Sequence, residues 1–346
     1  MCVRSNKIYS HWTQQTGFKM VENSTIVDPF YIHVYDWTKH SVSIFFGISV
    51  LLGVPGNILV IAVHKRIREK SVTDWMIFYV ALCDIMSLIN APLYFCQLQS
   101  LWPLGFPDFL CKYHYCNMHS ISMSSYLFCA IMALERYFKV VTSKDILSLT
   151  LVRYIWIPVF LVSYGIGSLI VFTVRNNPNG HCMYSYDGRN LAAIQYAIML
   201  FVAFMTTLVM IVCYARIGVF LHMKMKEVSR SGNALSKSYK QTLQITNVLA
   251  IVTIVFLFSS NTPYIVGVVF SLEQPVDEPS MSMLLVFSLT FYINTFFNPF
   301  LYTVMSATFR IRTKRLFQSC CGSPYLPSEQ SQSAQSDTRD GTVPLS

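Results

Sequence analysis

The last apolar run of the chain carries polar residues that can hydrogen-bond to neighbours, together with a residue that bends helices. Between Leu289 and Tyr302 the sequence is hydrophobic enough for lipid, yet it contains Asn294, Asn298 and Pro299. Polar side chains inside a bilayer must find internal partners, and proline removes a backbone donor and loosens the preceding turn. The pattern predicts a helix that faces other helices and can move. An ordinary packed helix with a proline kink is the alternative.

The ionisable side chains offer little catalytic chemistry. Asp84 is the only carboxylate deep inside an apolar run, where a charge is costly and usually functional. His64, His222 and the other histidines lie apart, without metal-ligand spacing or a nucleophile motif. We therefore expect a protein that is not an enzyme.

The composition indicates a membrane protein. The 346 residues are 53% hydrophobic and 12% charged, whereas soluble domains average about 25% charged residues. The net charge of +9 would suit nucleic acid only as a basic patch on a soluble fold, but here Lys and Arg fall between apolar runs. Ten cysteines in so long a chain do not make a small disulfide scaffold. We expect no nucleic-acid partner.

Seven apolar runs are long enough to cross a bilayer. They cover residues 42–63, 75–98, 111–140, 154–174, 190–221, 244–271 and 281–304. The sequence therefore predicts an all-α membrane protein, with a seven-transmembrane bundle over residues 41–305. The polar start of the chain lacks the apolar core of a secretory signal, so we expect the first span to act as an uncleaved signal anchor.

Basic residues gather in alternate loops, which predicts the orientation. The basic loops hold Lys65, Arg66, Arg68 and Lys70, then Lys139, Lys144 and Arg153, then Lys224, Lys226, Arg230, Lys237 and Lys240, and finally Arg310, Arg312, Lys314 and Arg315. Positive loops face the cytoplasm, so we expect residues 1–40 outside the cell and the C-terminus inside, in the plasma membrane. Asn23, in the triplet Asn23-Ser24-Thr25, is then placed for glycosylation.

A short amphipathic helix is predicted at residues 306–319, after the last span. Phe309, Leu316 and Phe317 stand there among basic residues. Cys320 and Cys321 follow at once and are candidates for palmitoylation, with free cytosolic cysteines as the alternative. The Ser-, Gln- and Pro-rich segment 320–346 is expected to be a disordered cytoplasmic tail.

Short motifs occur one per apolar run, in order along the chain. They are Gly56-Asn57, Leu82-Cys83-Asp84, Glu135-Arg136-Tyr137, Trp156-Ile157-Pro158, Tyr214, Pro263 and Asn298-Pro299-Phe300-Leu301-Tyr302. Together they resemble the rhodopsin-like G-protein-coupled receptors over about residues 40–320. The resemblance implies a receptor that binds an extracellular ligand and activates a heterotrimeric G protein by outward movement of helix six, with arrestin and membrane lipids as further partners.

The resemblance also implies a sodium site that stabilises the resting state. In the family, an aspartate like Asp84 encloses the ion with residues that match Ser125, Asn294 and Asn298. Hard oxygen ligands suit such a cation. A water-bridged polar cluster is the alternative, and no other cofactor is expected.

At the cytoplasmic end, the resemblance implies that Arg136 pairs with Glu135 at rest and meets the G protein when helix six moves away. Arginine suits this role because it stays charged and offers five donors. The residues expected to serve coupling and activation are Glu135, Arg136, Tyr137, Tyr214, Asn261, Pro263, Pro299 and Tyr302. In many relatives a second acidic residue on helix six restrains the arginine, but Leu243 stands there in this sequence. We therefore expect raised basal signalling.

The family pattern favours a disulfide between Cys111 and Cys182, with Cys96, Cys116 and Cys2 as competing partners.

Four positions of the usual relay between ligand and helix six depart from the family. They are Asn261 for tryptophan, Leu257 for phenylalanine, Thr206 for proline and Tyr126 for a smaller aliphatic residue. The polar Asn261 is expected to extend the sodium network.

The upper cavity argues against some ligand classes. Tyr292 replaces the Schiff-base lysine of opsins, and Met118 replaces the aspartate of monoamine receptors. The candidate ligand contacts are Tyr94, Gln97, His114, Tyr115, Met118, His119, Gln195, Tyr264, Ser288 and Tyr292. Aromatic and neutral polar side chains suit a peptide, although each could equally serve packing. A receptor for a lipid or small polar metabolite, a non-signalling scavenger receptor and a transporter remain as alternatives.

Overall fold

The computed structural model describes residues 36–98, 107–176, 182–184, 189–230, 237–272, 282–283, 286–287, 289–305 and 307–320. The expected sites at Asn23, Ser288 and Cys321 lie outside these residues, as do the side chains of Tyr94, Gln97 and Cys320.

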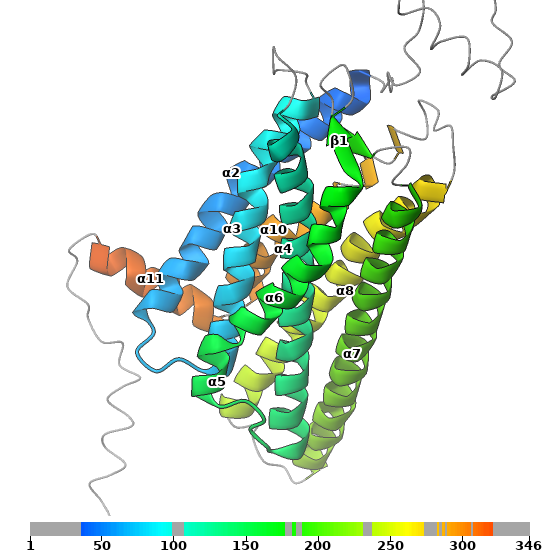
Figure 1. The fold of residues 1–346 in the computed structure, drawn as a ribbon. Coiled ribbons are helices and arrows are strands. Elements are labelled where there is room, and N and C mark those ends of the chain that lie inside the picture. Colours follow the sequence, from blue (N-terminus) through cyan, green and yellow to red (C-terminus); the bar gives the residue numbers. More distant parts are fainter. Residues whose placement is uncertain are drawn as a thin grey trace, which may run out of the picture. The chain divides into compact units, whose positions relative to one another are not determined.

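The described chain is almost entirely helical (Figure 1). The long helices are α2 (Asp36–Arg66), α3 (Val72–Leu98), α4 (Asp108–Tyr137), α7 (Arg189–Arg230), α8 (Lys237–Leu272) and α10 (Thr290–Met305). The shorter ones are α5 (Leu149–Tyr154), α6 (Trp156–Gly167) and α11 (Ala307–Cys320). A π-helical turn, η1 (Phe138–Thr142), follows α4, and a 3₁₀ turn, η2 (Ser168–Phe172), follows α6. Each of the seven predicted spans therefore contains a helix.

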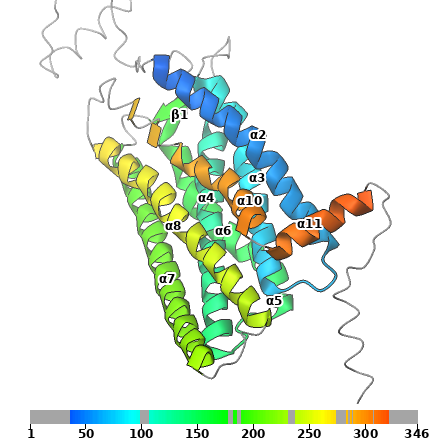
Figure 2. The same ribbon diagram turned by 180° about the vertical axis from the view of Figure 1, so that it is seen from behind.

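The long helices close into a ring. Helix α2 packs on α3, α3 on α4, α4 on α7, α7 on α8, α8 on α10, and α10 again on α2. Helix α6 packs against α4, which is the most enclosed of the helices and buries residues along its whole length. Helix α11 leaves the bundle at one end, here called the α11 end, while strand β1 lies at the other (Figures 1 and 2).

Much of the apolar surface of the helices is exposed, as expected for helices covered by lipid. Leu51, Leu161 and Phe201 are each more than half exposed, which would be costly in water. By length and composition, four of the described helical segments can cross a membrane: Asp36–Arg66, Val72–Leu93, Leu149–Phe172 and Asn190–Val228.

Two of the predicted spans differ in detail from the helices. The run predicted at 154–174 is interrupted at Ile155, between α5 and α6. Pro158 explains this break, because it has no N–H for the carbonyl of Tyr154 and its ring crowds that carbonyl. The last predicted span starts at residue 281, whereas the continuous helix α10 begins at Thr290.

A two-stranded antiparallel hairpin, which the sequence did not predict, follows α6. Strand β1 (Val174–Asn176) pairs with β2 (Cys182–Tyr184), and Asn176 lies opposite Cys182. Cys182 forms a disulfide with Cys111 at the start of α4, which confirms the pairing that the family pattern implied. The disulfide ties the hairpin to the start of α4, at the end of the bundle opposite α11 (Figure 1).

The closest approach between α4 and α6 gives a test of the packing. A Cβ at Gly167 would collide with Ser120, whereas a Cβ at Gly165 on the same helix would meet nothing within 4 Å. We predict that Gly167→Ala lowers stability by about 1–3 kcal/mol through overpacking. Gly165→Ala should be neutral or stabilising by about 0.5–1 kcal/mol, because alanine favours helix. Thermal unfolding of the purified protein measures both, and equal melting temperatures for the two variants would contradict the packing described here.

Candidate functional site

Helix α10 receives a hydrogen bond from another helix near Pro299. Proline cannot donate to the carbonyl of Thr295, one turn earlier. Asn57 on α2 supplies the missing donor, since its Nδ2 lies 2.6 Å from Thr295 O and 3.0 Å from Gly53 O. The two helices touch there, because a Cβ at Gly56 would lie 2.8 Å from the Pro299 ring. The partner that a buried proline requires thus comes from another helix.

One turn away, the polar residues of α3, α4 and α10 surround a small cavity. It measures about 20 Å³, and its walls are Asp84, Ser87, Ser122, Ser125, Tyr126, Phe256, Asn294 and Thr295. Three of the four expected sodium ligands therefore share one cavity. The fourth, Asn298, donates from Nδ2 to Asp84 Oδ2 over 3.2 Å. A cavity of this size has room for about one water-sized particle.

The polar groups around the cavity fit a small hard cation. Ser122 donates its hydroxyl hydrogen to Met118 O at 2.9 Å, which leaves its oxygen lone pairs free to accept. Asn294 directs Nδ2 to Ser259 Oγ at 2.6 Å. A carboxylate, hydroxyl oxygens and an amide form the set that a sodium ion would use.

Sequence reasoning missed Ser87 and Ser122 as cavity residues. Each stands three positions from a predicted ligand, Ser87 after Asp84 and Ser122 before Ser125. Residues three apart share a helix face, so helical spacing alone could have found both.

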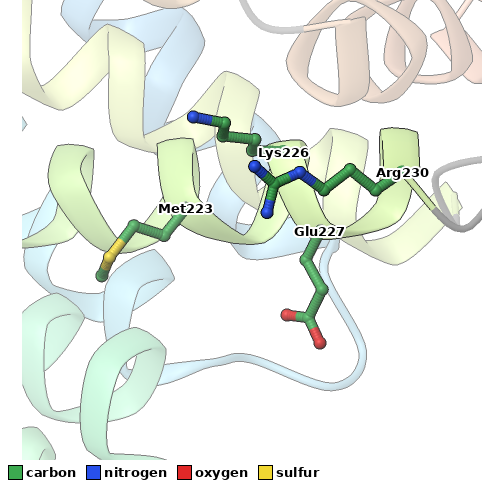
Figure 3. A pocket seen from close by; sticks show the side chains of 4 residues that line it. All are labelled: Met223, Lys226, Glu227 and Arg230. Atoms are coloured by element: carbon green, nitrogen blue, oxygen red, sulfur yellow. The ribbon is translucent and has the colours of Figure 1, made fainter.

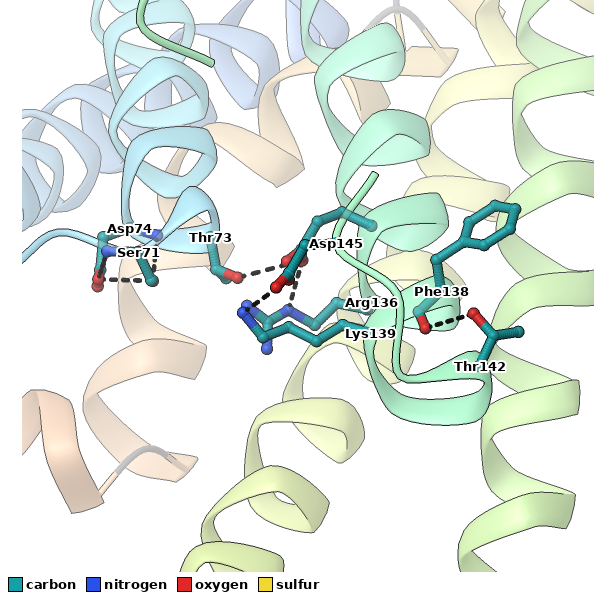
Figure 4. A network of polar contacts seen from close by, with 9 residues as sticks. Ser71, Thr73, Asp74, Arg136, Phe138, Lys139, Thr142 and Asp145 are labelled. Carbon is teal, nitrogen blue, oxygen red and sulfur yellow. Dashed lines mark hydrogen bonds and ion pairs between the residues drawn. The ribbon is translucent and has the colours of Figure 1, made fainter. Parts of the chain in front are cut away.

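At the α11 end of α4, the expected ion pair is formed. Arg136 Nε lies 2.9 Å from Glu135 Oε2, with side chains 10% and 4% exposed. Thr73 on α3 donates to the same carboxylate oxygen over 3.4 Å (Figure 4). Sequence reasoning missed Thr73, which lies 62 residues away along the chain. In the described part of the chain no ion pair joins Arg136 to α8.

The other residues expected to serve coupling include three tyrosines. Tyr214 and Tyr302 are buried. The ring of Tyr302 packs on that of Phe309 of α11, with 6.2 Å between the ring centres. Leu243 packs at the edge of the apolar core, as expected for a residue that cannot restrain an arginine. Tyr137 stacks edge-on with Phe138, at the start of the π-helical turn.

Asn261 takes a different partner from the one expected. Its Nδ2 donates to Leu257 O at 3.0 Å and lies 3.5 Å from Thr207 Oγ1 on α7. It is not among the cavity walls. Tyr126 is there instead, and its ring also packs edge-on against Phe256 at 5.6 Å. Pro263, two residues after Asn261, is buried inside α8.

Most of the candidate ligand contacts lie inside the bundle near the hairpin end. His114, His119, Gln195, Tyr264 and Tyr292 are buried, while Tyr115 and Met118 are partly buried. The rings of His119 and Tyr264 lie 6.2 Å apart, so the structure brings these two together. The ring of Tyr292 packs instead on the ring of Phe46 of α2, with 4.7 Å between the ring centres. Both amide atoms of Gln195 lack a hydrogen-bond partner among the described residues.

The α11 end of α7 carries a hollow that sequence reasoning also missed. It has a volume of about 420 Å³ and is lined by Met223, Lys226, Glu227 and Arg230 (Figure 3). These residues recur every three or four positions, so they share one helix face. Glu227 pairs with Lys224 at 2.8 Å. Lys226 and Arg230 make this face suited to acidic groups of a partner.

The sequence is also similar to those of known proteins. The sequence profile of the family described as 7 transmembrane receptor (rhodopsin family) matches residues 56–302. The human galanin receptor type 1 is 27% identical over 289 residues, which cover 79% of this chain and 80% of that receptor. The growth hormone secretagogue receptor type 1 of the rat is 26% identical over 292 residues, which cover 77% of this chain and 78% of that receptor.

The family match extends from the Gly56 contact with Pro299, through the cavity around Asp84, to Tyr302 at the other end of α10. The chain is therefore a multi-pass membrane protein, and it belongs to the rhodopsin family of seven-transmembrane receptors.

Proposed function

We propose that this receptor binds an extracellular peptide and activates a heterotrimeric G protein when α8 moves outward at the α11 end. The observation that carries the proposal is the buried Glu135–Arg136 ion pair at that end of α4. In this proposal the N-terminus is extracellular, the C-terminus is cytoplasmic, and the receptor acts in the plasma membrane. The alternation of basic and acidic loops supports that orientation.

The ion pair has the properties of a switch. The planar guanidinium of Arg136 can make several directed hydrogen bonds. At rest its charge is neutralised by Glu135 within 2.9 Å. Once released, the same guanidinium can bind a carboxylate or carbonyl group of a partner. The basic face of α7 around Lys226 and Arg230 offers further contacts.

A peptide ligand is supported by the side chains near the hairpin end and by the relatives. The relatives are named as receptors for galanin and for growth hormone secretagogues. His119, Tyr264 and Gln195 offer aromatic rings and a neutral amide, which suit peptide side chains and backbone. Because the amide of Gln195 has no partner among the described residues, a ligand that reached it would supply one.

The cavity around Asp84 binds sodium in this proposal and stabilises the resting receptor. Asp84, Ser125, Asn294 and Asn298 hold the ion, joined by Ser87 and Ser122. The hydrogen bond from Ser122 to Met118 O supports this set, since it leaves acceptor lone pairs on Ser122. The sequence further supports glycosylation at Asn23 and palmitoylation at Cys320 and Cys321, which follow the basic residues of α11.

The first prediction concerns ligand-free signalling. The wild-type receptor should activate at least one G-protein subtype above empty cells, and Arg136→Ala should remove that signal because the guanidinium makes the partner contact. Nucleotide exchange across a panel of subtypes, at equal surface expression, measures both. Equal signals from the receptor and Arg136→Ala would contradict the assignment, and uptake of radiolabelled solute would favour a transporter.

The second prediction concerns the missing restraint on α8. Leu243→Glu should lower basal nucleotide exchange roughly tenfold, because one hydrogen bond to a charged group is worth on the order of 1.5–3 kcal/mol. Leu243→Gln is the matched control, since it has the same length and no charge. If both variants signal like the wild type, the absence of an acidic residue does not set the basal level.

The third prediction concerns sodium. Replacing choline by sodium at equal ionic strength should raise the melting temperature of the purified receptor by about 2–4 °C, the shift expected for about 1 kcal/mol of binding energy. Asp84→Asn should remove the difference between the two salts, whatever its own stability. A sodium effect that persists in Asp84→Asn would place the ion elsewhere.

A further inference from the structure

In the first turn of α3, one carboxylate caps the helix with one oxygen and binds another helix with the other. Asp74 Oδ2 accepts from the backbone N of Ser71 at 2.9 Å and from its hydroxyl at 2.7 Å. In return, Ser71 Oγ accepts from the backbone N of Asp74 at 3.2 Å (Figure 4). This reciprocal cap fixes the start of the helix. It occupies Oδ2 and leaves Oδ1 of Asp74 for another partner.

That partner comes from α11. Arg312 Nη1 donates to Asp74 Oδ1 at 3.0 Å, over a separation of 238 residues. The side chains are 37% and 15% exposed. Arg310 of the same helix donates to the carbonyls of Thr303 and Val304 at the end of α10. Helix α11 is therefore attached by arginines both to the end of α10 and to the start of α3.

The same turn of α3 also reaches the Glu135–Arg136 pair. Thr73, adjacent to Asp74, donates to Glu135 Oε2, the oxygen that faces Arg136 Nε. Thr73 and Glu135 are both buried. The hydrogen bond of 3.4 Å is long, so a small shift of the turn would break it. Whatever fixes this turn therefore fixes the carboxylate that holds Arg136.

We propose that Asp74 and Arg312 are positioning residues, which hold Thr73 against Glu135 and so keep Arg136 in its resting pair. The docking of α11 is thereby coupled to the availability of Arg136. A partner that draws Arg312 away from Asp74 loosens the first turn of α3 and favours release of Arg136. The inference rests on the proposed role of Arg136 in G-protein activation.

The test uses the full-length receptor in nanodiscs, with two readouts. Arg312→Gln and Asp74→Asn should each speed hydrogen–deuterium exchange of α11 by about two- to fivefold, the effect of losing one partly exposed ion pair. Each should raise ligand-free nucleotide exchange by a similar factor. Arg312→Lys should restore both readouts at least in part, and the double variant should not exceed either single one. Lys314→Gln is the matched control, because it removes one exposed charge from the same helix.

A Thr73→Val background separates coupling from simple docking. In that background, Arg312→Gln should still speed hydrogen–deuterium exchange in α11. It should no longer change ligand-free nucleotide exchange. The inference is overturned if Arg312→Gln behaves like Lys314→Gln, or if Thr73→Val leaves the effect of Arg312→Gln on signalling intact. Should no variant, including Arg136→Ala, alter nucleotide exchange while α11 still loosens, the proposed G-protein function fails and the docking contact stands.

Discussion

Polar groups enclosed in an apolar bundle have no water to bind, so another part of the chain must pair with them. Pro299 creates such a need in the middle of α10, because it leaves the carbonyl of Thr295 without its helical donor. Asn57 meets that need from α2 at 2.6 Å. The bond sets the register between the first and last helices of the ring, and Gly56 allows the approach. The missing helical hydrogen bond in α10 is thus replaced by one from a defined partner.

The same constraint links the two ends of the bundle through α10. Asn294 donates to Ser259 on α8, and Asn298 donates to Asp84 on α3. Tyr302, one turn further, packs on Phe309 of α11. A movement of α8 must therefore break or stretch the Asn294–Ser259 bond beside the cavity. An ion bound in the cavity, as proposed above, would add contacts that oppose this movement.

The sequence predicted the helices well because each span is a long apolar run with polar loops between. The disulfide and the Glu135–Arg136 pair followed from the family resemblance, and the structure has both. The break at Ile155 could also have been placed, since Pro158 acts on the carbonyl four residues earlier. The lengths of the apolar runs and the position of Pro158 were sufficient for the helices and the break, whereas the disulfide and the ion pair needed the family motifs.

The contacts between distant segments could not be predicted from the sequence. Thr73 contacts Glu135, and Asp74 contacts Arg312, only because each helix is rotated about its own axis so that these side chains face one another. Asn261 shows the limit at a single residue: its position suggested the ion cavity, yet it donates to Leu257 O and lies near Thr207. A side-chain amide in a helix competes for the carbonyl one turn earlier. Likewise, the burial of candidate ligand contacts such as His119 and Tyr264 could not be foreseen.

These internal contacts hold α8 against the bundle, and in the proposed function coupling to a G protein moves α8 outward. The most direct measurement is the distance between spin labels at Lys65 on α2 and Asn247 on α8, whose side chains are both exposed. Labels introduced as unnatural amino acids avoid the native cysteines. Adding nucleotide-free G protein to the receptor in nanodiscs should lengthen this distance, and Arg136→Ala should reduce the lengthening. A distance that stays unchanged while the G protein is bound would contradict the account.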